Sequence, residues 1–443
     1  MNLFICLRQI ITWQRPLNLN SSSDPSATET AITRRRAYTV LGVLMLIYIS
    51  SFVDRQIVAV LAVQIRDELG LSNLQSGLLY GTAFSFIYAF AGLPMGRIAD
   101  LHNRKWLIIS GLLCWSAATV ASGYAQSFTV LIIARLAVGV SQAMLSPAVY
   151  SLLADYFAPQ RRGTVYSLYA SSIFVGVALS FLIGGAISQA YDWRAAMIAV
   201  GLPGFAIALA ALFLIKEVTG SRSKNQEAST GRTALGVLKY MLNKPTVRYH
   251  LLGFSFLAFL GYTILAFMST VLADMFGRSD LIPHFGWFML GTGVSVTLSG
   301  RIADYLARYS PKYRFVMGFV AALGGIPLYL IGLLWVDHGL AALLLIGTAV
   351  IFSSSYNGVA AALLQYLVKS DMRALAGGLY LFVISVVGFG IGPPLTGWLM
   401  DAVFNGPGGP GKALVVVIIG CAIGAVLSFI KAIQHYPADA EVE

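Results

Sequence analysis

Long apolar stretches alternate with short polar ones along almost the whole chain. Each apolar run is long enough to cross a hydrocarbon core of about 30 Å as a helix. Charged residues or Gly, Pro and Asn separate the runs and mark the ends of the expected helices. We therefore predict an all-α membrane protein with twelve transmembrane helices, at about residues 38–65, 73–98, 105–124, 128–157, 163–190, 194–216, 248–275, 282–306, 313–335, 340–368, 374–403 and 412–433.

One polar segment divides the predicted helices into two groups of six. Residues 217–246 begin with Ser, Thr, Gly and charges of both signs, and we expect them to form a cytoplasmic linker. Residues 34–216 and 247–434 are the expected N-terminal and C-terminal bundles. Residues 1–33 should form a disordered or surface-lying tail without a cleaved signal peptide, and residues 435–443 a short C-terminal tail.

Basic residues lie at alternate ends of the predicted helices and so give the chain an orientation. Examples are Arg34-Arg35-Arg36, Arg104-Lys105 and Arg161-Arg162. Because loops rich in Lys and Arg stay on the inner side, we expect both termini in the cytoplasm and the chain in the cell inner (plasma) membrane. The net charge of +11 is thereby explained, and nucleic acid is not an expected partner.

The composition argues against several other classes of protein. Only 11% of the residues are charged, whereas soluble domains carry about a quarter, so most of the surface must face lipid. The 3 cysteines and 5 histidines show no metal-ligand spacing, and we expect neither a metal nor a cofactor. No nucleophile motif, phosphate-binding loop or ion-filter sequence supports an enzyme, an ATP-driven pump or a channel.

The pentapeptide GRIAD occurs twice, at Gly96–Asp100 and at Gly300–Asp304. An arginine follows each copy four residues after the aspartate, at Arg104 and Arg308. Both copies fall at the predicted cytoplasmic end of the second helix of a half. The repeat therefore indicates two homologous halves related by an axis along the membrane normal, which is one of the repeat plans of transporters.

This twelve-helix pattern, the loop after the second helix and RLAVG at Arg135–Gly139 together resemble the major facilitator superfamily over residues 34–435. Within it, the stretches Ser50–Leu79, Asn103–Lys105 and Asp192–Gly204 are similar to the spinster branch, whose known members export lysolipids and sphingolipids. The resemblance implies a transporter that moves an amphiphilic or anionic small molecule, such as a lysolipid or a sphingolipid-like lipid, by proton-coupled alternating access. A drug/proton antiporter or an organic-anion symporter is the alternative. We expect the chain to act as a monomer.

The repeated pentapeptide has the chemistry of a cytoplasmic gate. Glycine at positions 96 and 300 allows a neighbouring helix to approach closely. The carboxylates of Asp100 and Asp304 can accept hydrogen bonds from the free N–H groups at the N-terminus of an adjacent helix. The family resemblance implies that this helix belongs to the opposite half, so that the contact closes the inner gate.

The two copies of the gate differ in the expected partner of the arginine. Arg104 has an acidic candidate partner in Asp155, whereas the residue corresponding to it for Arg308 is Gln365. We therefore predict an asymmetric latch that is stronger in the first half. The alternative is that these charges only mark helix ends and follow the inside rule.

Charged residues inside the first half are the strongest candidates for a functional site. Asp54 and Arg55 lie roughly 24 Å along the first helix, and Arg135 lies at a similar depth in the fourth. Ionisable groups at such depth are expensive and by default functional. Burial favours the protonated form of Asp54 and the arginines favour its ionised form, as a proton-coupling site requires, although a static Asp54–Arg135 ion pair is the alternative.

Two arginines beside one acid leave a positive charge for a substrate carboxylate or phosphate. Gln142, two turns from Arg135 on the same face, stands where the spinster pattern usually has glutamate. It has the shape of a protonated glutamate but cannot titrate. Either Asp54 alone couples, or Gln142 imitates the protonated state.

Hydroxyl-bearing and aromatic residues are expected to line the rest of the substrate cavity, which suits an amphiphile, although each of them can instead be a packing residue. These are Tyr80, Tyr88, Tyr166, Tyr169, Tyr262, Tyr356 and Asn357. Pro393-Pro394 and several neighbouring glycines make the eleventh helix a candidate gating helix.

Overall fold

The computed structural model describes residues 34–217, 233–369 and 372–439. Within these ranges, eleven helical segments are long and apolar enough to cross a membrane. A further helical stretch, Asn73–Leu101, provides the twelfth crossing. The predicted all-α membrane fold is confirmed. The tail 1–33, residues 218–232 of the expected linker and residues 440–443 lie outside the described ranges.

The first half contains six crossings, and several of them are built from more than one helix. They are α2 (Arg34–Val60), followed by the short α3 (Ala62–Leu69); α4 (Asn73–Gly77), η1 (Leu78–Thr82) and α5 (Ala83–Leu101); α6 (Arg104–Ser122); α7 (Phe128–Ala143) and α8 (Leu145–Tyr156); α9 (Pro159–Leu179), η2 (Ser180–Gly184) and α10 (Gly185–Ala190); and α11 (Trp193–Leu214).

The second half repeats this plan after an additional short helix, α12 (Ala234–Asn243). Its crossings are α13 (Pro245–Thr270) and η4 (Val271–Met275); η5 (Ser279–Leu281) and α14 (Phe285–Ala307); η6 (Pro311–Phe315), α15 (Val316–Leu323) and α16 (Ile326–Leu334); α17 (Gly339–Ser353) and α18 (Asn357–Leu367); α19 (Arg373–Ile384), η8 (Ser385–Ile391), α20 (Gly392–Trp398) and η9 (Leu399–Val403); and α21 (Gly409–Asp439).

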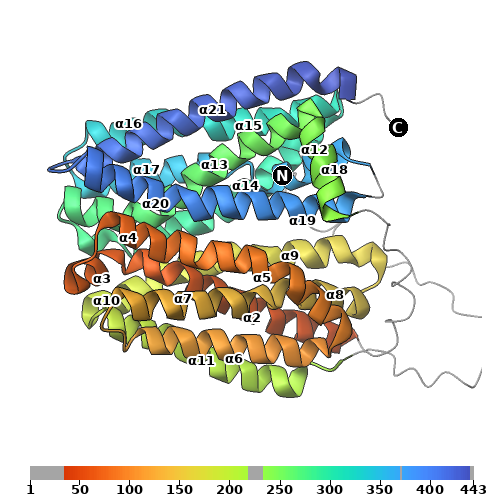
Figure 1. The fold of residues 1–443 in the computed structure, drawn as a ribbon, viewed down its shortest axis with the longest axis horizontal. Helices are drawn as coiled ribbons and strands as arrows, with labels where there is room; N and C mark the ends of the chain where they lie inside the picture. Colours follow the sequence, from red (N-terminus) through yellow and green to blue (C-terminus); the bar gives the residue numbers. More distant parts are fainter. Residues whose placement is uncertain (1–33, 218–232, 370–371, 440–443) are drawn as a thin grey trace, which may run out of the picture.

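The two halves lie side by side with their long helices roughly aligned (Figure 1). The described chain begins and ends at the same end of the molecule, which we call the terminal end. The opposite end, where α3, α4 and α10 lie, we call the distal end. Polar side chains start several helices there: Ser72 caps α4, Ser127 caps α7 and Asp192 caps α11.

Glycines of the first half pack directly on the prolines of the eleventh crossing near the distal end. A Cβ atom on Gly77 would lie 2.5 Å from the carbonyl oxygen of Pro393, and one on Gly81 would lie 2.4 Å from that of Phe389. Both positions therefore exclude any larger side chain. The spacing Gly77-x-x-x-Gly81 is the small-residue pattern that lets membrane helices approach closely.

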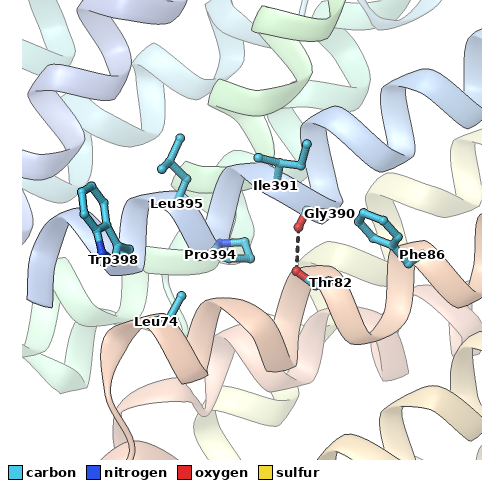
Figure 2. A pocket seen from close by; sticks show the side chains of 8 residues that line it. All are labelled: Leu74, Thr82, Phe86, Gly390, Ile391, Pro394, Leu395 and Trp398. Carbon is cyan, nitrogen blue, oxygen red and sulfur yellow. Dashed lines mark hydrogen bonds between the residues drawn. The ribbon is translucent and has the colours of Figure 1, made fainter. Parts of the chain in front are cut away.

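Proline also explains the hydrogen bond that crosses this contact. Pro394 has no N–H group, so the carbonyl oxygen of Gly390 lacks its usual helical donor. The hydroxyl group of Thr82 in the first half donates to this oxygen at 2.6 Å (Figure 2). Beside the bond, a shallow groove of about 380 Å³ runs between the halves and is lined by Leu74, Thr82, Phe86, Gly390, Ile391, Pro394, Leu395 and Trp398 (Figure 2).

Two carboxylates of the second half complete the distal contact. Asp401 accepts hydrogen bonds from the backbone N–H groups of Asn73 at 3.1 Å and Leu74 at 2.8 Å, at the N-terminus of α4. Asp274 accepts two bonds from the guanidinium group of Arg66, at 2.6 and 2.9 Å. We call the contacts of Gly77, Gly81, Thr82, Asp401 and Asp274 with the opposite half the distal seam.

Candidate functional site

The buried charged residues expected from the sequence come together in the first half. Arg135 of α7 donates to the backbone carbonyl oxygens of Asp54 at 2.8 Å and of Arg55 at 3.0 Å, both on α2. The guanidinium group thus ties two helices together through the backbone. Within the described ranges no ion pair joins Arg135 to the Asp54 carboxyl group, so the static pair considered from the sequence is not formed here.

The carboxyl group of Asp54 is fully buried and weakly held. Its Oδ2 atom lies 3.5 Å from the Ser50 hydroxyl group, and its Oδ1 atom has no hydrogen-bond partner among the described residues. Desolvation of an ionised carboxylate in such a place costs a large free energy, which one long hydrogen bond offsets only in part. The surroundings of Asp54 in this conformation therefore suit a neutral, protonated carboxyl group.

Arg55 lies in a box of aromatic rings. Its guanidinium carbon is 4.5 Å from the ring centroid of Phe52, 4.3 Å from that of Phe84 and 5.0 Å from that of Tyr88. One Nη atom donates to Gln142 at 3.2 Å, while the Nε atom has no partner in the described part of the chain. The rings hold the cation by cation–π attraction and leave hydrogen-bonding capacity free.

Gln142 uses both ends of its amide group. Its oxygen accepts the bond from Arg55, and its nitrogen donates to the backbone carbonyl oxygen of Ser51 at 3.0 Å. A glutamate could make the first contact but, when ionised, not the second. Gln142 therefore fixes the position of Arg55 without neutralising its charge.

Three of the predicted cavity tyrosines are linked to the rings around Arg55 by a series of ring contacts. Tyr88 stacks on Phe84, Tyr169 stacks on Tyr48 at 4.3 Å, and Tyr166 meets Tyr150 edge to face at 5.2 Å. Tyr48 lies two helical turns before Arg55 on the same face of α2. Its partly exposed ring extends the aromatic surface beyond the Arg55 box.

Tyr80 and Tyr262 lie where the two halves meet. The Tyr80 hydroxyl group donates to Gln56 at 2.9 Å, and the Gln56 amide donates to the carbonyl oxygen of Leu265 in the second half at 3.4 Å. Tyr262 stacks on Phe389 at 4.6 Å, and the Tyr80 ring meets the same Phe389 edge to face. These tyrosines therefore connect the Arg55 side of the site to the second half.

The other two predicted cavity residues have different surroundings. Tyr356 is buried in the apolar core of the second half and stacks on Phe254. Asn357 is exposed and donates to the backbone carbonyl oxygen of Ser354 at 2.9 Å. Neither makes a hydrogen bond or ring contact with Arg55 within the described ranges.

At the terminal end, Arg104 of the first half is the centre of an ionic network. It lies 2.6 Å from a carboxylate oxygen of Asp155 and donates to Glu217 at 2.8 Å and to the Ser151 hydroxyl group at 2.9 Å. Glu217 also accepts from the backbone N–H of Lys105 at 3.1 Å. The segment that follows α11 is thus fastened to the start of α6.

The second copy of the pentapeptide has a weaker arrangement. Asp304 lies 3.5 Å from Arg314, and 79% of its side chain is exposed. Arg308 is exposed beside the Tyr305 ring and has no ion pair among the described residues. A Cβ on Gly300 would meet no described atom within 4 Å, so this glycine makes no close helix contact in this conformation. The surroundings of Gly96 and the side chain of Asp100 lie outside what the structure describes.

A family model, the Major Facilitator Superfamily, matches residues 44–393. The chain belongs to this superfamily. Its members are transporters, not enzymes. The two six-crossing halves described above are the fold of this superfamily.

Within the superfamily, the chain is similar to transporters of several kinds. It is 28% identical to an MFS-type efflux pump of Mycolicibacterium smegmatis, covering 91% of this chain and 94% of the pump. It is 26% identical to Protein spinster homolog 3 of Danio rerio (86% and 80% covered) and 26% identical to the hexuronate transporter of Bacillus subtilis (91% and 97%). A solved inward-facing, unoccupied bacterial homolog of the human lysosomal transporter spinster shares the fold, with a TM-score of 0.81, 24% identity, and 92% and 99% of the two chains covered.

Several contacts of this facilitator did not follow from the sequence interpretation. Glu217 lies in the predicted linker, and no sequence pattern distinguishes Asp401 or Tyr48. The pattern Gly77-x-x-x-Gly81, by contrast, is a sequence motif that predicts a close contact between helices. The contact between Asp401 and Asn73 cannot be predicted from a local sequence pattern, because the two residues are far apart in the sequence.

Proposed function

We propose that this protein is a proton-coupled secondary transporter that moves an amphiphilic anion by alternating access. The observation that carries the proposal is that two adjacent residues of α2 have surroundings suited to opposite roles. Arg55 is a cation held by aromatic rings with hydrogen-bonding capacity to spare, and Asp54 is a buried carboxyl group without a cationic partner among the described residues. One can receive an anion while the other receives a proton.

The surroundings of Arg55 favour a substrate with an anionic head and an apolar body. A guanidinium group pairs well with a carboxylate or a phosphate. The rings of Phe52, Phe84 and Tyr88, continued by Tyr48 and Tyr169, offer apolar surface beside it. A lysolipid or sphingolipid-like lipid has both parts, and the similarity to Protein spinster homolog 3 supports this class.

A small organic anion is the second candidate. The hexuronate transporter of Bacillus subtilis is named for an anionic sugar acid and matches nearly the whole chain. Such a substrate would use Arg55 in the same way but would need polar partners in place of the aromatic surface. The shared chemistry of both candidates is a carboxylate or phosphate on Arg55.

The proposed coupling group is Asp54. Its surroundings suit a neutral carboxyl group in the present arrangement, in which the distal seam joins the halves. Release of the proton would leave a buried negative charge, which favours a different arrangement of helices around it. The equilibrium between the two arrangements then depends on the proton.

We further propose that the terminal end faces the cytoplasm of an inner membrane and that the protein works as a monomer. The basic clusters at that end support this orientation. The arrangement described here would then be open toward the cytoplasm. In the opposite arrangement, Asp100 and Asp304 would meet helix N-termini of the other half, and Gly96 and Gly300 would allow the approach.

Reconstitution in liposomes tests the proposal. Labelled lysophospholipid, labelled hexuronate and a labelled cationic drug are offered separately, each with and without a pH gradient. We expect an anionic substrate to be transported faster when a pH gradient is present. A protonophore, which collapses the gradient, should remove this acceleration. Transport of the cationic drug alone would contradict the anion assignment, and transport of any substrate at equal rates under all gradients would contradict proton coupling.

A further inference from the structure

A third helix contacts Asp54 besides the two that carry the arginines. The carboxyl group packs against α6, from which the side chains of Thr119 and Trp115 face it. Thr119 is 1% exposed and Trp115 is 0% exposed. The carboxyl group of Asp54 therefore lies at the contact between α2 and α6.

The facing polar atoms on both sides of this contact are unpaired. The Asp54 Oδ1, Thr119 Oγ1 and Trp115 Nε1 atoms are all buried, and none of them has a hydrogen-bond partner within the described ranges. Buried polar groups are almost always paired, so three unpaired ones in one place require an explanation. An indole N–H is only a donor, a hydroxyl group can donate, and an ionised carboxylate is only an acceptor. The three atoms are chemically complementary.

The charged neighbours of Asp54 do not satisfy its carboxyl group. The two Nη atoms of Arg135, on α7, donate to backbone carbonyl oxygens, and Arg55, on α2, is held by aromatic rings and Gln142. Tyr80, a further titratable group that faces Arg135, donates to Gln56. Among the described residues, the Arg135 Nε atom is the unpaired donor on the α7 side, and the donors on the α6 side that can reach an ionised Asp54 are Thr119 and Trp115.

The same helix begins at the terminal network. Arg104 is the first residue of α6, and its guanidinium group binds Asp155 and Glu217. A helix of this length moves as a rigid rod, so a shift at Thr119 reaches Arg104. This connects the Asp54 site with the end of the molecule where the expected gate lies.

We propose that Thr119 and Trp115 are positioning residues that close on Asp54 when it is ionised and release it when it is protonated, so that α6 moves with the charge of Asp54. This inference rests on the proposed proton coupling at Asp54. It assigns to α6 the task of carrying the protonation state toward the terminal network. The two side chains touch no substrate in this scheme.

Infrared difference spectroscopy of the full-length protein in lipid nanodiscs tests the inference without a substrate. The carboxyl C=O band of Asp54 is assigned as the band that Asp54→Asn removes, and its intensity is followed from about pH 5 to pH 9. Thr119→Val and Trp115→Phe each remove one donor to the ionised form with little change in shape. Each should move the midpoint of the titration to higher pH by about one unit.

Two variants on the same helix serve as controls. Thr119→Ser keeps the hydroxyl group and should restore the wild-type midpoint. Ser116→Ala removes another buried, unpaired hydroxyl group of α6, which lies against Gly204, and should leave the midpoint unchanged. A general loosening of α6 would move the Ser116→Ala midpoint as well, which would overturn the inference.

The remaining outcomes separate the inference from the function on which it rests. If an Asp54 band titrates but Thr119→Val and Trp115→Phe leave its midpoint unchanged, the role of α6 is wrong and proton binding at Asp54 stands. If no band that depends on Asp54 titrates over this range, the proposed coupling site itself is wrong.

Discussion

Arg135 donates to the backbone carbonyl oxygen of Asp54 at 2.8 Å, and it leaves the carboxyl group of the same residue without a cationic partner among the described residues. A charge that would ordinarily hold Asp54 ionised is used instead to fasten α7 to α2. The carboxyl group is therefore free to change its protonation state without breaking an ion pair.

The aromatic rings around Arg55 predict that substrate binding requires the planar shape of its guanidinium group as well as its charge. Arg55→Lys keeps the charge but loses the planar stacking and the bond geometry to Gln142. We expect the apparent affinity for an anionic substrate to fall about 10-fold or more, as for loss of a charged hydrogen bond. Concentration dependence of uptake in liposomes measures this. Arg248→Lys, where an exposed arginine stacks on Tyr249, is the matched control and should transport normally.

Gln142→Glu tests whether the amide at this position keeps Arg55 available. An ionised glutamate would pair with Arg55 and compete with the substrate anion, and it could not donate to the carbonyl oxygen of Ser51. We expect weaker anion uptake at neutral pH that recovers as the pH is lowered and the new carboxyl group protonates. Identical affinity and pH profiles in variant and wild type would mean that Gln142 is only polar packing.

The distal seam predicts that Asp401 stabilises the arrangement described here. Asp401→Asn removes a negative charge from the N-terminus of α4, a contact worth about 1–2 kcal/mol, or roughly a 5- to 30-fold shift in the equilibrium. Spin labels at the exposed positions Tyr191 and Trp335, one in each half, should report a larger population of long distances across the distal end.

Asp280→Asn is the matched control for that measurement. Asp280 is also at the distal end, but it pairs with Arg278 of its own half at 2.7 Å. Its loss should leave the distance distribution unchanged. Equal responses of the two variants would show that the charge at Asp401 has no special effect on the seam.

The different surroundings of the two pentapeptide copies predict that removing an acidic residue near each copy lowers the free energy of unfolding by unequal amounts. Asp155→Asn removes an anion from a nearly buried Arg104, and we expect a loss of about 1–3 kcal/mol in the free energy of unfolding. Asp304→Asn removes a mostly exposed partner at 3.5 Å and should cost less than about 0.5 kcal/mol. Thermal unfolding in detergent compares the two variants directly. An equal or larger effect at Asp304 would contradict the asymmetry.

The sequence predicted the fold because crossing a membrane constrains it strongly. Twelve apolar runs must become helices, since backbone groups in lipid have to be paired within the segment. Asp54, Arg55 and Arg135 stood out for a related reason, because a charge within such a run is expensive. The sequence also offered Asp155, at the end of the fourth predicted helix, as the acidic partner of Arg104, and the two side chains do form an ion pair.

Other features depend on contacts that no local pattern specifies. The partner of Arg135 is the backbone, whose position is known only once α2 and α7 are packed. Asp401 and Asn73 are joined across the two halves, and Glu217 reaches Arg104 from the end of the sixth crossing. Tyr356 shares its residue type with the cavity tyrosines but is buried in the core of the second half.

Gradient-driven transport by Asp54→Asn tests the central claim most directly. Liposomes containing the variant or the wild type are loaded with the anionic substrate identified above, and both net transport under a pH gradient and exchange without a gradient are measured. We predict that the variant retains exchange, because the Arg55 box is intact, but no longer responds to the gradient. Gradient-driven accumulation by Asp54→Asn equal to that of the wild type would contradict coupling at this residue.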